Sequence, residues 1–296
     1  MTRLRVGTRG SELALIQTRW VCQLLRIKHP SVTIDELIIK THGDVAKTQL
    51  FSDDWPSGGF TGAIEQALVQ RRIDFAVHSF KDLPTAATLG LTVAAVPPRE
   101  SANDVLVTRR RIRLDGLPAG LRIGTSSPRR TAQLRRLADV HIVPVRGNVP
   151  TRIAQVETEL DGVVVAAAGL RRLGLDPPHR IDLPLERFPT APAQGALAVQ
   201  VREEEANIAE LLATLDDAES RRAVMAERAF LQAIGAGCQT PVGATAVVEG
   251  GAVSLRGQIF SEDGRHVVEG VERGEDGSLL GRRLAERLMR ELARAG

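Results

Sequence analysis

The chain has 296 residues, which corresponds to about two domains at roughly 150 residues each. Hydrophobic residues make up 43% and charged residues 25%, values typical of globular proteins that exclude disordered and fibrous classes. The formal net charge is only +3, and aromatic residues make up 3% with no Tyr, so the stacking surface used by single-strand nucleic-acid binders is largely missing.

The first predicted elements form a strand, a tight turn and a helix. Residues 4–8 predict the strand, and apolar residues at helical spacing follow from Ser11 onward. The same strand-turn-helix pattern recurs from residue 121. Residues 121–125 predict the strand, and Ser126, Ser127 and Pro128 lead into a predicted helix at 129–137. The repetition of Val-Gly-Thr as Ile-Gly-Thr indicates an internal duplication.

Further strands alternate with helices along both halves of the chain. We expect strands at 32–40, 74–78, 140–145 and 162–167, and helices at 63–72 and 150–159. This alternation is typical of α/β domains with mainly parallel sheets. Proline-containing stretches at 95–103 and 183–196 predict crossings between two domains and therefore a hinged cleft.

After residue 217 the pattern changes. It predicts a helix at 220–234, strands with Gly-rich turns over 242–271 and an amphipathic helix at 279–295, which together indicate a small α+β domain. We therefore expect three domains: residues 1–97 with 196–215, residues 103–190, and residues 218–296.

Cysteine and histidine usage argues against a disulfide framework and a metal. Cys22 lies on the apolar face of the first helix, where we expect it to be buried, and the six His show no paired spacing of the kind a zinc site uses. No apolar run reaches the roughly 18 residues of a membrane helix, and the N-terminus lacks the pattern of a secretory signal, so we expect a cytoplasmic protein.

Arginine dominates the cations: four of the 39 basic residues are Lys and the other 35 are Arg. Codon usage is one explanation for this preference. The other is that a planar guanidinium binds a carboxylate or phosphate through two hydrogen bonds. Arg9 with Ser11, and Arg129 and Arg130 with Ser127, stand at predicted helix starts, which favour anions. Plain N-capping by Ser is the alternative.

A second group of arginines follows predicted strand ends, where ligands bind in open α/β sheets. Its members are Arg146, Arg152 and Arg172, and a solvated basic face is the alternative interpretation. The run at 109–113 lies between turn signals, and we expect it to be an exposed loop.

Two further stretches carry reactive groups. Lys81 and Asp82 follow the strand at 74–78, where one carboxylate beside a cation can serve as a general acid/base or hold a developing positive charge; ordinary turn chemistry is the alternative. Cys238 lies between glycines and a proline, in a loop where a thiol would be accessible, and we interpret it as a covalent tether.

Taken together, these motifs resemble those of the porphobilinogen deaminase family over essentially the whole chain. The matching stretches are residues 7–11, 76–84, 124–130, 146–149, 193–196 and 237–239. The resemblance implies two domains similar to type II periplasmic binding proteins and a smaller third domain that carries the cysteine. It also implies a monomeric transferase of tetrapyrrole (haem) biosynthesis, which joins four porphobilinogen molecules into hydroxymethylbilane and releases ammonia.

The resemblance also implies residue roles. Cys238 would hold a dipyrromethane cofactor through a thioether, and Asp82 and the neighbouring Lys81 would be the catalytic residues, with Asp82 as the catalytic carboxylate. The cofactor-binding residues implied are Arg9, Ser11, Ser79, Lys81, Asp82, Thr125, Ser127, Arg129, Arg130 and Arg146. Those implied for the substrate are Arg9, Arg146, Arg152, Arg172 and Gln194.

This sequence departs from the family pattern in one loop. Many members carry lysines in the stretch that corresponds to residues 43–60, whereas this chain has Asp53, Asp54 and Gly58-Gly59 there. We expect the loop to act as a lid, since the glycines permit movement. A non-catalytic anion-binding protein and a nucleic-acid binder are the alternative functions, and neither accounts for Asp82 or Cys238.

Overall fold

The structure is a computed structural model that describes residues 2–40, 61–235, 241–261 and 264–295. The chain divides into two compact units: unit 1 comprises Met1–Glu100 and Gly195–Arg221, and unit 2 comprises Ser101–Gln194 and Arg222–Gly296. The chain passes from unit 1 to unit 2 after Glu100 and from unit 2 to unit 1 after Gln194. Both points fall in the proline-containing stretches at 95–103 and 183–196. Cys238 and the expected lid at 43–60 lie outside the described residues.

Unit 1 is built on a five-stranded mixed sheet in the order β2-β1-β3-β10-β4. Strand β1 (Thr2–Thr8) pairs in parallel with β2 (Val32–Ile38) and β3 (Phe75–Ser79). Strand β10 (Leu197–Arg202) runs antiparallel between β3 and β4 (Leu91–Ala95). The carboxyl ends of β1 and β3 therefore lie at the same edge of the sheet, and the residues that follow them are neighbours.

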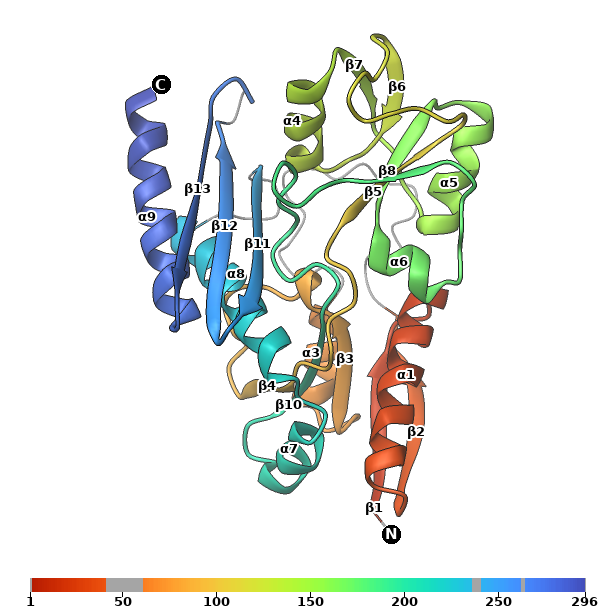
Figure 1. Cartoon of the computed structure of the whole chain (residues 1–296). Coiled ribbons are helices and arrows are strands. Elements are labelled where there is room, and N and C mark those ends of the chain that lie inside the picture. Colours follow the sequence, from red (N-terminus) through yellow and green to blue (C-terminus); the bar gives the residue numbers. More distant parts are fainter. Residues whose placement is uncertain (1, 41–60, 236–240, 262–263, 296) are drawn as a thin grey trace. The chain divides into compact units, whose positions relative to one another are not determined.

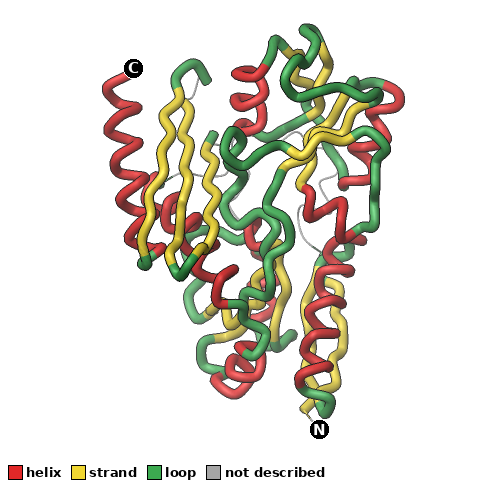
Figure 2. Tube along the Cα trace, in the orientation of Figure 1, coloured by secondary structure: helices red, strands yellow, loops and turns green. Residues whose placement is uncertain are grey.

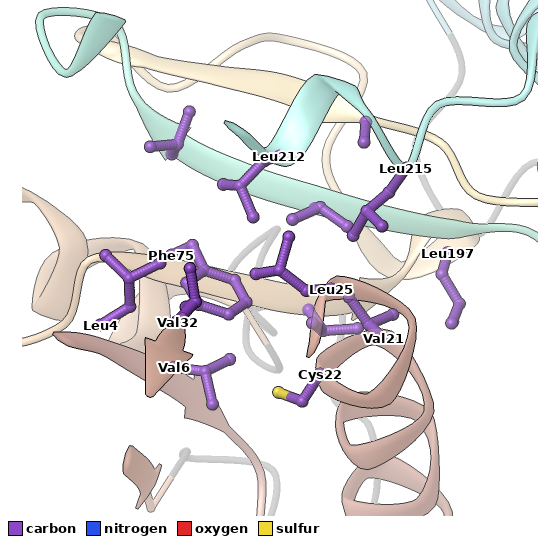
Figure 3. Packing of buried hydrophobic residues seen from close by; sticks show 14 residues of the cluster. Leu4, Val6, Val21, Cys22, Leu25, Val32, Phe75, Leu197, Leu212 and Leu215 are labelled. Atoms are coloured by element: carbon purple, nitrogen blue, oxygen red, sulfur yellow. The ribbon is translucent and has the colours of Figure 1, made fainter. Parts of the chain in front are cut away.

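Helices cover both faces of this sheet. On one face, Leu25 of α1 (Glu12–Lys28) and Leu212 of α7 (Ala206–Ala213) join a buried cluster with Phe75 (Figure 3). On the other, α3 (Gly62–Val69) packs Ile64 and Leu68 into a second cluster. Figure 1 shows α1 lying along β1 and β2.

Cys22 belongs to the first of these clusters, which confirms the expected burial. It is 4% exposed, and burial raises the pKa of its thiol to about 11. The thiol therefore stays protonated at neutral pH and serves as a packing group.

Unit 2 contains a second five-stranded sheet, in the order β7-β6-β8-β5-β9. Strand β6 (Leu121–Gly124) is parallel to both β7 (Val140–Val143) and β8 (Gly162–Ala166). Strand β5 (Asp104–Thr108) runs antiparallel between β8 and β9 (Arg180–Asp182). In both sheets the second strand is parallel to both of its neighbours and the fourth strand runs antiparallel, so the two units share the strand arrangement that the repeated sequence pattern predicted.

The repeated glycine has the same packing role in both sheets. A Cβ atom at Gly7 would collide with the side chain of Ile73, and one at Gly124 would collide with Leu160 and Val145. Each sheet therefore needs glycine at this position, because a neighbouring apolar side chain fills the space of the missing Cβ.

Two helices of the unit 2 sheet region, α4 (Pro128–Leu137) and α5 (Val149–Thr158), begin within one residue of their predicted starts, whereas the short α6 (Ala167–Arg172) was not predicted. The C-terminal part has an antiparallel sheet of β11 (Val242–Glu249), β12 (Ala252–Phe260) and β13 (Val267–Gly274) with α9 (Gly277–Ala295), while α8 (Ala218–Ile234) leads into it. Figure 2 shows these three strands side by side with α9 along them. The predicted α/β class with a small α+β part is confirmed, but the expectation of mainly parallel sheets is wrong: in each five-stranded sheet two strand pairings are parallel and two are antiparallel.

Candidate functional site

A pocket of about 90 Å³ opens at the edge of the unit 1 sheet where β1 and β3 end. Four predicted site residues, Arg9, Ser11, Ser79 and Asp82, line it together. The other lining residues are Leu13, Ala14, Gln17, Thr61, Ile64, Val77 and His78. We call this site the Asp82 pocket.

Asp82 owes its position to the strand that precedes it. Strand β3 ends at Ser79 and continues into a 3-10 turn, η1 (Phe80–Asp82), whose Phe80 is 2% exposed and anchors the turn in the core. Both Lys81 and Asp82 are exposed. The buried Phe80 therefore fixes a turn that presents a carboxylate and an ammonium at the end of the strand.

The opposite wall of the pocket is the N-terminus of α1. The Ser11 hydroxyl accepts a hydrogen bond from the N–H of Ala14 at 3.4 Å and so caps the helix. Gln17, one turn further on, donates from Nε2 to the Ser79 hydroxyl at 3.1 Å. This contact joins α1 to the end of β3, and it leaves the positive end of the helix dipole and Arg9 on one side of the pocket.

The corresponding turn in unit 2 has the same capping geometry. The Ser127 hydroxyl accepts from the N–H of Arg130 at 3.4 Å, and Pro128 occupies the first turn of α4. Thr125 is 2% exposed, and its hydroxyl accepts from the N–H of Ser127 at 3.1 Å. N-capping and an anion-favouring helix end therefore coexist at both turns, so the two interpretations of these serines are compatible.

Arg129 and Arg130 turn inward and share one carboxylate. Arg129 Nη2 donates to Asp104 Oδ2 at 2.9 Å, and Arg130 Nη2 donates to Asp104 Oδ1 at 2.5 Å. Their side chains are 5% and 10% exposed, against 1% for Asp104. We call these residues, with Gln194, the Asp104 cluster. Its two guanidiniums and one carboxylate carry a net charge of +1, which makes this part of unit 2 electropositive.

Burial and charge compete at this cluster. Burial raises the pKa of the Asp104 carboxyl, but Arg130 and Arg129 outweigh it and hold that pKa below its ordinary value. Burial lowers the pKa of Arg129, and Asp104 opposes this effect. The Asp104 carboxylate is thus kept ionised by its partners, and the pairing makes it possible to bury the two cations.

Gln194 belongs to the same cluster. It is fully buried, and its Nε2 donates to Asp104 Oδ1 at 2.9 Å and to the main-chain carbonyl of Ala102 at 2.8 Å. The structure therefore places the side-chain amide against the carboxylate that orients the arginines. Its predicted contact with substrate stays a prediction.

Of the remaining predicted arginines, Arg146 lies just after a strand of unit 2, whereas Arg152 and Arg172 lie in the helices that follow strands. Arg146 follows β7 and Arg172 ends α6, and both are partly exposed. Arg152, in α5, donates from Nε to the Gly147 carbonyl at 2.9 Å, and burial together with Arg130 lowers its pKa. The run at 109–113 has all four of its arginines exposed, as expected.

Several residues of the two sites were not predicted from the sequence. Asp104, Thr61 and Gln17 fall in this group, and His78 was noted only as part of its motif. Asp104 begins a strand of which every residue is buried, and an ionisable residue in that position needs a partner, but neither the strand nor its burial was predicted from the sequence. Within the described ranges, no group of three or more His, Cys, Asp or Glu could hold a metal ion, and no helix is long and apolar enough to cross a membrane.

Comparison with known proteins places the chain among its relatives. Residues 4–210 match the family model "Porphobilinogen deaminase, dipyromethane cofactor binding domain", and residues 221–290 match "Porphobilinogen deaminase, C-terminal domain". A porphobilinogen deaminase of Syntrophus aciditrophicus is 44% identical over 293 residues, covering 97% of this chain and 95% of that protein. One of Nocardia farcinica is 46% identical over 303 residues, covering 97% and 86%.

Among solved structures, the methionine-binding protein MetQ is 11% identical with a TM-score of 0.44, covering 72% of this chain and 89% of that one. The family models and the full-length relatives agree with the ordered motifs on which the resemblance was based. The chain belongs to the porphobilinogen deaminase family.

Proposed function

We propose that the Asp82 pocket and the Asp104 cluster carry out the reaction of this family in the present chain. In that reaction four porphobilinogen molecules are joined head to tail on a dipyrromethane primer, and hydroxymethylbilane and ammonia are released. The observation that carries the assignment is the shared pocket of Asp82, Arg9 and Ser11. It combines one carboxylate with a cation and a helix N-terminus, as a substrate with cationic intermediates and acid side arms requires.

Asp82 is the proposed catalytic residue. Its carboxylate, at the end of η1, would accept a hydrogen bond from a pyrrole N–H and stabilise the positive charge that the ring acquires when ammonia leaves. Lys81, its exposed neighbour, would hold an acid side arm. This division of roles explains why a single carboxylate lines a pocket that also contains an arginine.

The residues of unit 2 fit a ligand with several carboxylates. Arg130 Nε is buried and has no hydrogen-bond partner among the described residues, although the rest of its guanidinium is paired. The N-terminus of α4 lies directly beside it in the sequence. We propose that Thr125, Ser127, Arg129, Arg130 and Arg146 bind the cofactor's acid arms, and that Arg146, Arg152, Arg172 and Gln194 serve the substrate.

The dipyrromethane cofactor supplies the free pyrrole carbon to which the next unit is added. We propose that Cys238 holds it through a thioether. Helix α8 ends at Ile234 and β11 begins at Val242, so the loop that carries Cys238 joins two elements of the C-terminal part. Cys22 offers no competing tether, because its thiol is buried in unit 1.

Three further expectations belong to the same proposal. The C-terminal part, residues 218–296, would be a domain of its own beside residues 1–97 with 196–215 and residues 103–190. The protein would act as a monomer in the cytoplasm and would not bind nucleic acid. A basic nucleic-acid binder would instead lose affinity steeply with salt, which filter binding to duplex DNA at two salt concentrations would reveal.

An Asp82→Asn exchange tests the assignment, because it keeps the size of the side chain and removes its charge. We expect ammonia release from porphobilinogen to fall at least about hundredfold with the fold unchanged. Asp35→Asn, which removes one charge from an exposed strand residue, is the matched control and should retain full activity. If both variants release ammonia at the wild-type rate, Asp82 has no catalytic role. If the wild type releases no ammonia, the proposed reaction is wrong and non-catalytic anion binding becomes the favoured function.

A further inference from the structure

Thr61 occupies a helix N-cap without capping the helix. It precedes α3, and its carbonyl accepts hydrogen bonds from the N–H groups of Ile64 and Glu65, but its hydroxyl makes no capping bond. The residue is 2% exposed, and its Oγ1 has no hydrogen-bond partner among the described residues. A buried hydroxyl that gives up its usual capping bond is costly, so it points to a partner that binds in the Asp82 pocket, which Thr61 lines.

His78 is the second such group in this pocket. It is 4% exposed, and its Nε2 makes no hydrogen bond of ordinary length and angle to the described residues, although Gln200 lies near enough to favour the protonated ring. Burial lowers the pKa of the imidazole to about 4, although Glu65 and Gln200 oppose the shift. The ring is therefore neutral at neutral pH and can accept a hydrogen bond.

A buried carboxyl group lies behind this wall of the pocket. Glu65 is buried, and the described residues give it two neutral donors: Thr88 Oγ1 and Gln200 Nε2, each at 2.9 Å from its Oε1. No arginine or lysine of the described chain pairs with it. The wall formed by Thr61 and His78 therefore offers a hydroxyl and a neutral imidazole, two groups that can accept hydrogen bonds from an ammonium.

The two sides of the pocket thus have opposite character. Arg9 and the N-terminus of α1 favour an anion, whereas Thr61, His78 and the Asp82 carboxylate favour a cation. A ligand that carries a primary ammonium and a carboxylate on one small ring matches both sides. Resting on the function proposed above, we propose that Thr61 and His78 form the subsite for the aminomethyl ammonium group of the incoming pyrrole.

The location suits the departure of ammonia. When the C–N bond breaks, its electron pair leaves with the nitrogen as NH₃, and the positive charge passes from the ammonium to the pyrrole ring, which keeps its own N–H. No proton has to move in this step. A neutral imidazole and a hydroxyl hold the ammonium by hydrogen bonds and release neutral ammonia, while Asp82 lies in the same pocket to meet the charge on the ring.

Thr61→Val tests the subsite, because valine has the shape of threonine without the hydroxyl. We expect the KM for porphobilinogen to rise about tenfold or more, as for a lost hydrogen bond to a charged group. As a competitive inhibitor, the analogue with a methyl group in place of the aminomethyl group should keep its wild-type inhibition constant. Thr61→Ser, which restores the hydroxyl, should behave as wild type. Equal weakening of substrate and analogue would overturn the proposal.

Stability separates this role from a structural one. Since the Thr61 hydroxyl does not cap α3, Thr61→Val should leave the Tm unchanged or raise it. Ser127→Ala removes a hydroxyl that does cap a helix and should lower the Tm. A Tm loss in Thr61→Val as large as that in Ser127→Ala would mean that the hydroxyl is structural, which contradicts the proposal.

A third measurement does not depend on turnover. In protein labelled with ¹⁵N-histidine, the Nε2 resonance of His78, identified by its loss in His78→Gln, should shift saturably with methylammonium chloride and not with sodium acetate. A shift with acetate alone, or with neither salt, would overturn the ammonium subsite. Because the readout needs no catalysis, it stands even if the wild type fails to turn over porphobilinogen, which would refute the proposed function instead.

Discussion

The Arg129 guanidinium donates a hydrogen bond of 2.9 Å to Oδ2 of Asp104, at a place where the two side chains are 5% and 1% exposed. Arg130 takes the other carboxylate oxygen. Neither cation could be buried without this partner, because an unpaired buried charge costs several kcal/mol. One carboxylate therefore orients two arginines that follow each other at the start of α4.

Replacing Asp104 by Asn should be strongly destabilising. The amide leaves two buried guanidiniums without a counter-charge, and we expect the free energy of unfolding to fall by about 3 to 5 kcal/mol. Urea denaturation measures this change. Asp35→Asn breaks an exposed ion pair with Arg3, whose side chain is 74% exposed, and should cost at most about 1 kcal/mol. Similar losses in the two variants would mean that Asp104 does not hold the cluster together.

The Asp104 carboxylate also makes the free energy of unfolding of the wild type sensitive to acid. Its pKa in the folded protein lies below the ordinary value, so it contributes stability above about pH 4 that is lost as the pH falls through the folded pKa. The Asp104→Asn variant lacks this pH-dependent contribution, because its amide does not titrate. Its unfolding free energy should therefore change less between pH 4 and pH 2.5 than that of the wild type.

His78 predicts a second pH dependence in a different window. Its folded pKa of about 4 lies below the ordinary value of 6.5, so the unfolded chain binds a proton at a pH where the folded chain does not. Stability is complete above about pH 6.5 and falls towards pH 4, by up to about 3 kcal/mol. Unfolding free energies at pH 7 and pH 5 should differ less in His78→Gln. An equal difference in both proteins would show that the imidazole is not neutral in the fold.

Ala193 adopts a backbone conformation that glycine prefers. Its φ is 65°, and it is fully buried one residue before the passage from unit 2 to unit 1. Glycine would relieve about 1 to 2 kcal/mol of left-handed strain and lose about 0.8 kcal/mol of methyl burial. We expect Ala193→Gly to raise the Tm slightly. Ala198→Gly, at an equally buried strand position, is the control and should lower it.

Much of the fold could be predicted because its signals are local. Apolar periodicity and the recurring Gly-Thr-Ser turns gave the parallel strands and the helices α1 and α4, which the structure confirms. The strands β4, β5, β9 and β10 had no prediction. Short apolar runs do not distinguish a strand from a buried helix segment, and the pairing of β5 or β10 depends on partners far along the chain.

Some residues of the candidate site could likewise be predicted from the sequence, and others could not. The residues at helix starts and strand ends were predicted from local motifs, and the Asp82 pocket brings four of them together. The Asp104 cluster could not be predicted, because Asp104 is 25 residues from Arg129 and 90 from Gln194. Thr61 was equally hidden: a threonine before a helix ordinarily indicates a cap, and only the geometry shows that its hydroxyl is not used as one.

The central claim is that Cys238 carries two covalently bound pyrrole units in the active protein. Intact-protein mass spectrometry tests it most directly, with Cys22→Ser as the matched control for the loss of a thiol. We predict that the wild type and Cys22→Ser are heavier than their sequences by two pyrrole units, and that Cys238→Ser has the mass of its sequence. Porphobilinogen should then add further single units to the first two proteins alone. An active protein with the unmodified mass, or a Cys238→Ser variant that keeps the added mass, would contradict the account.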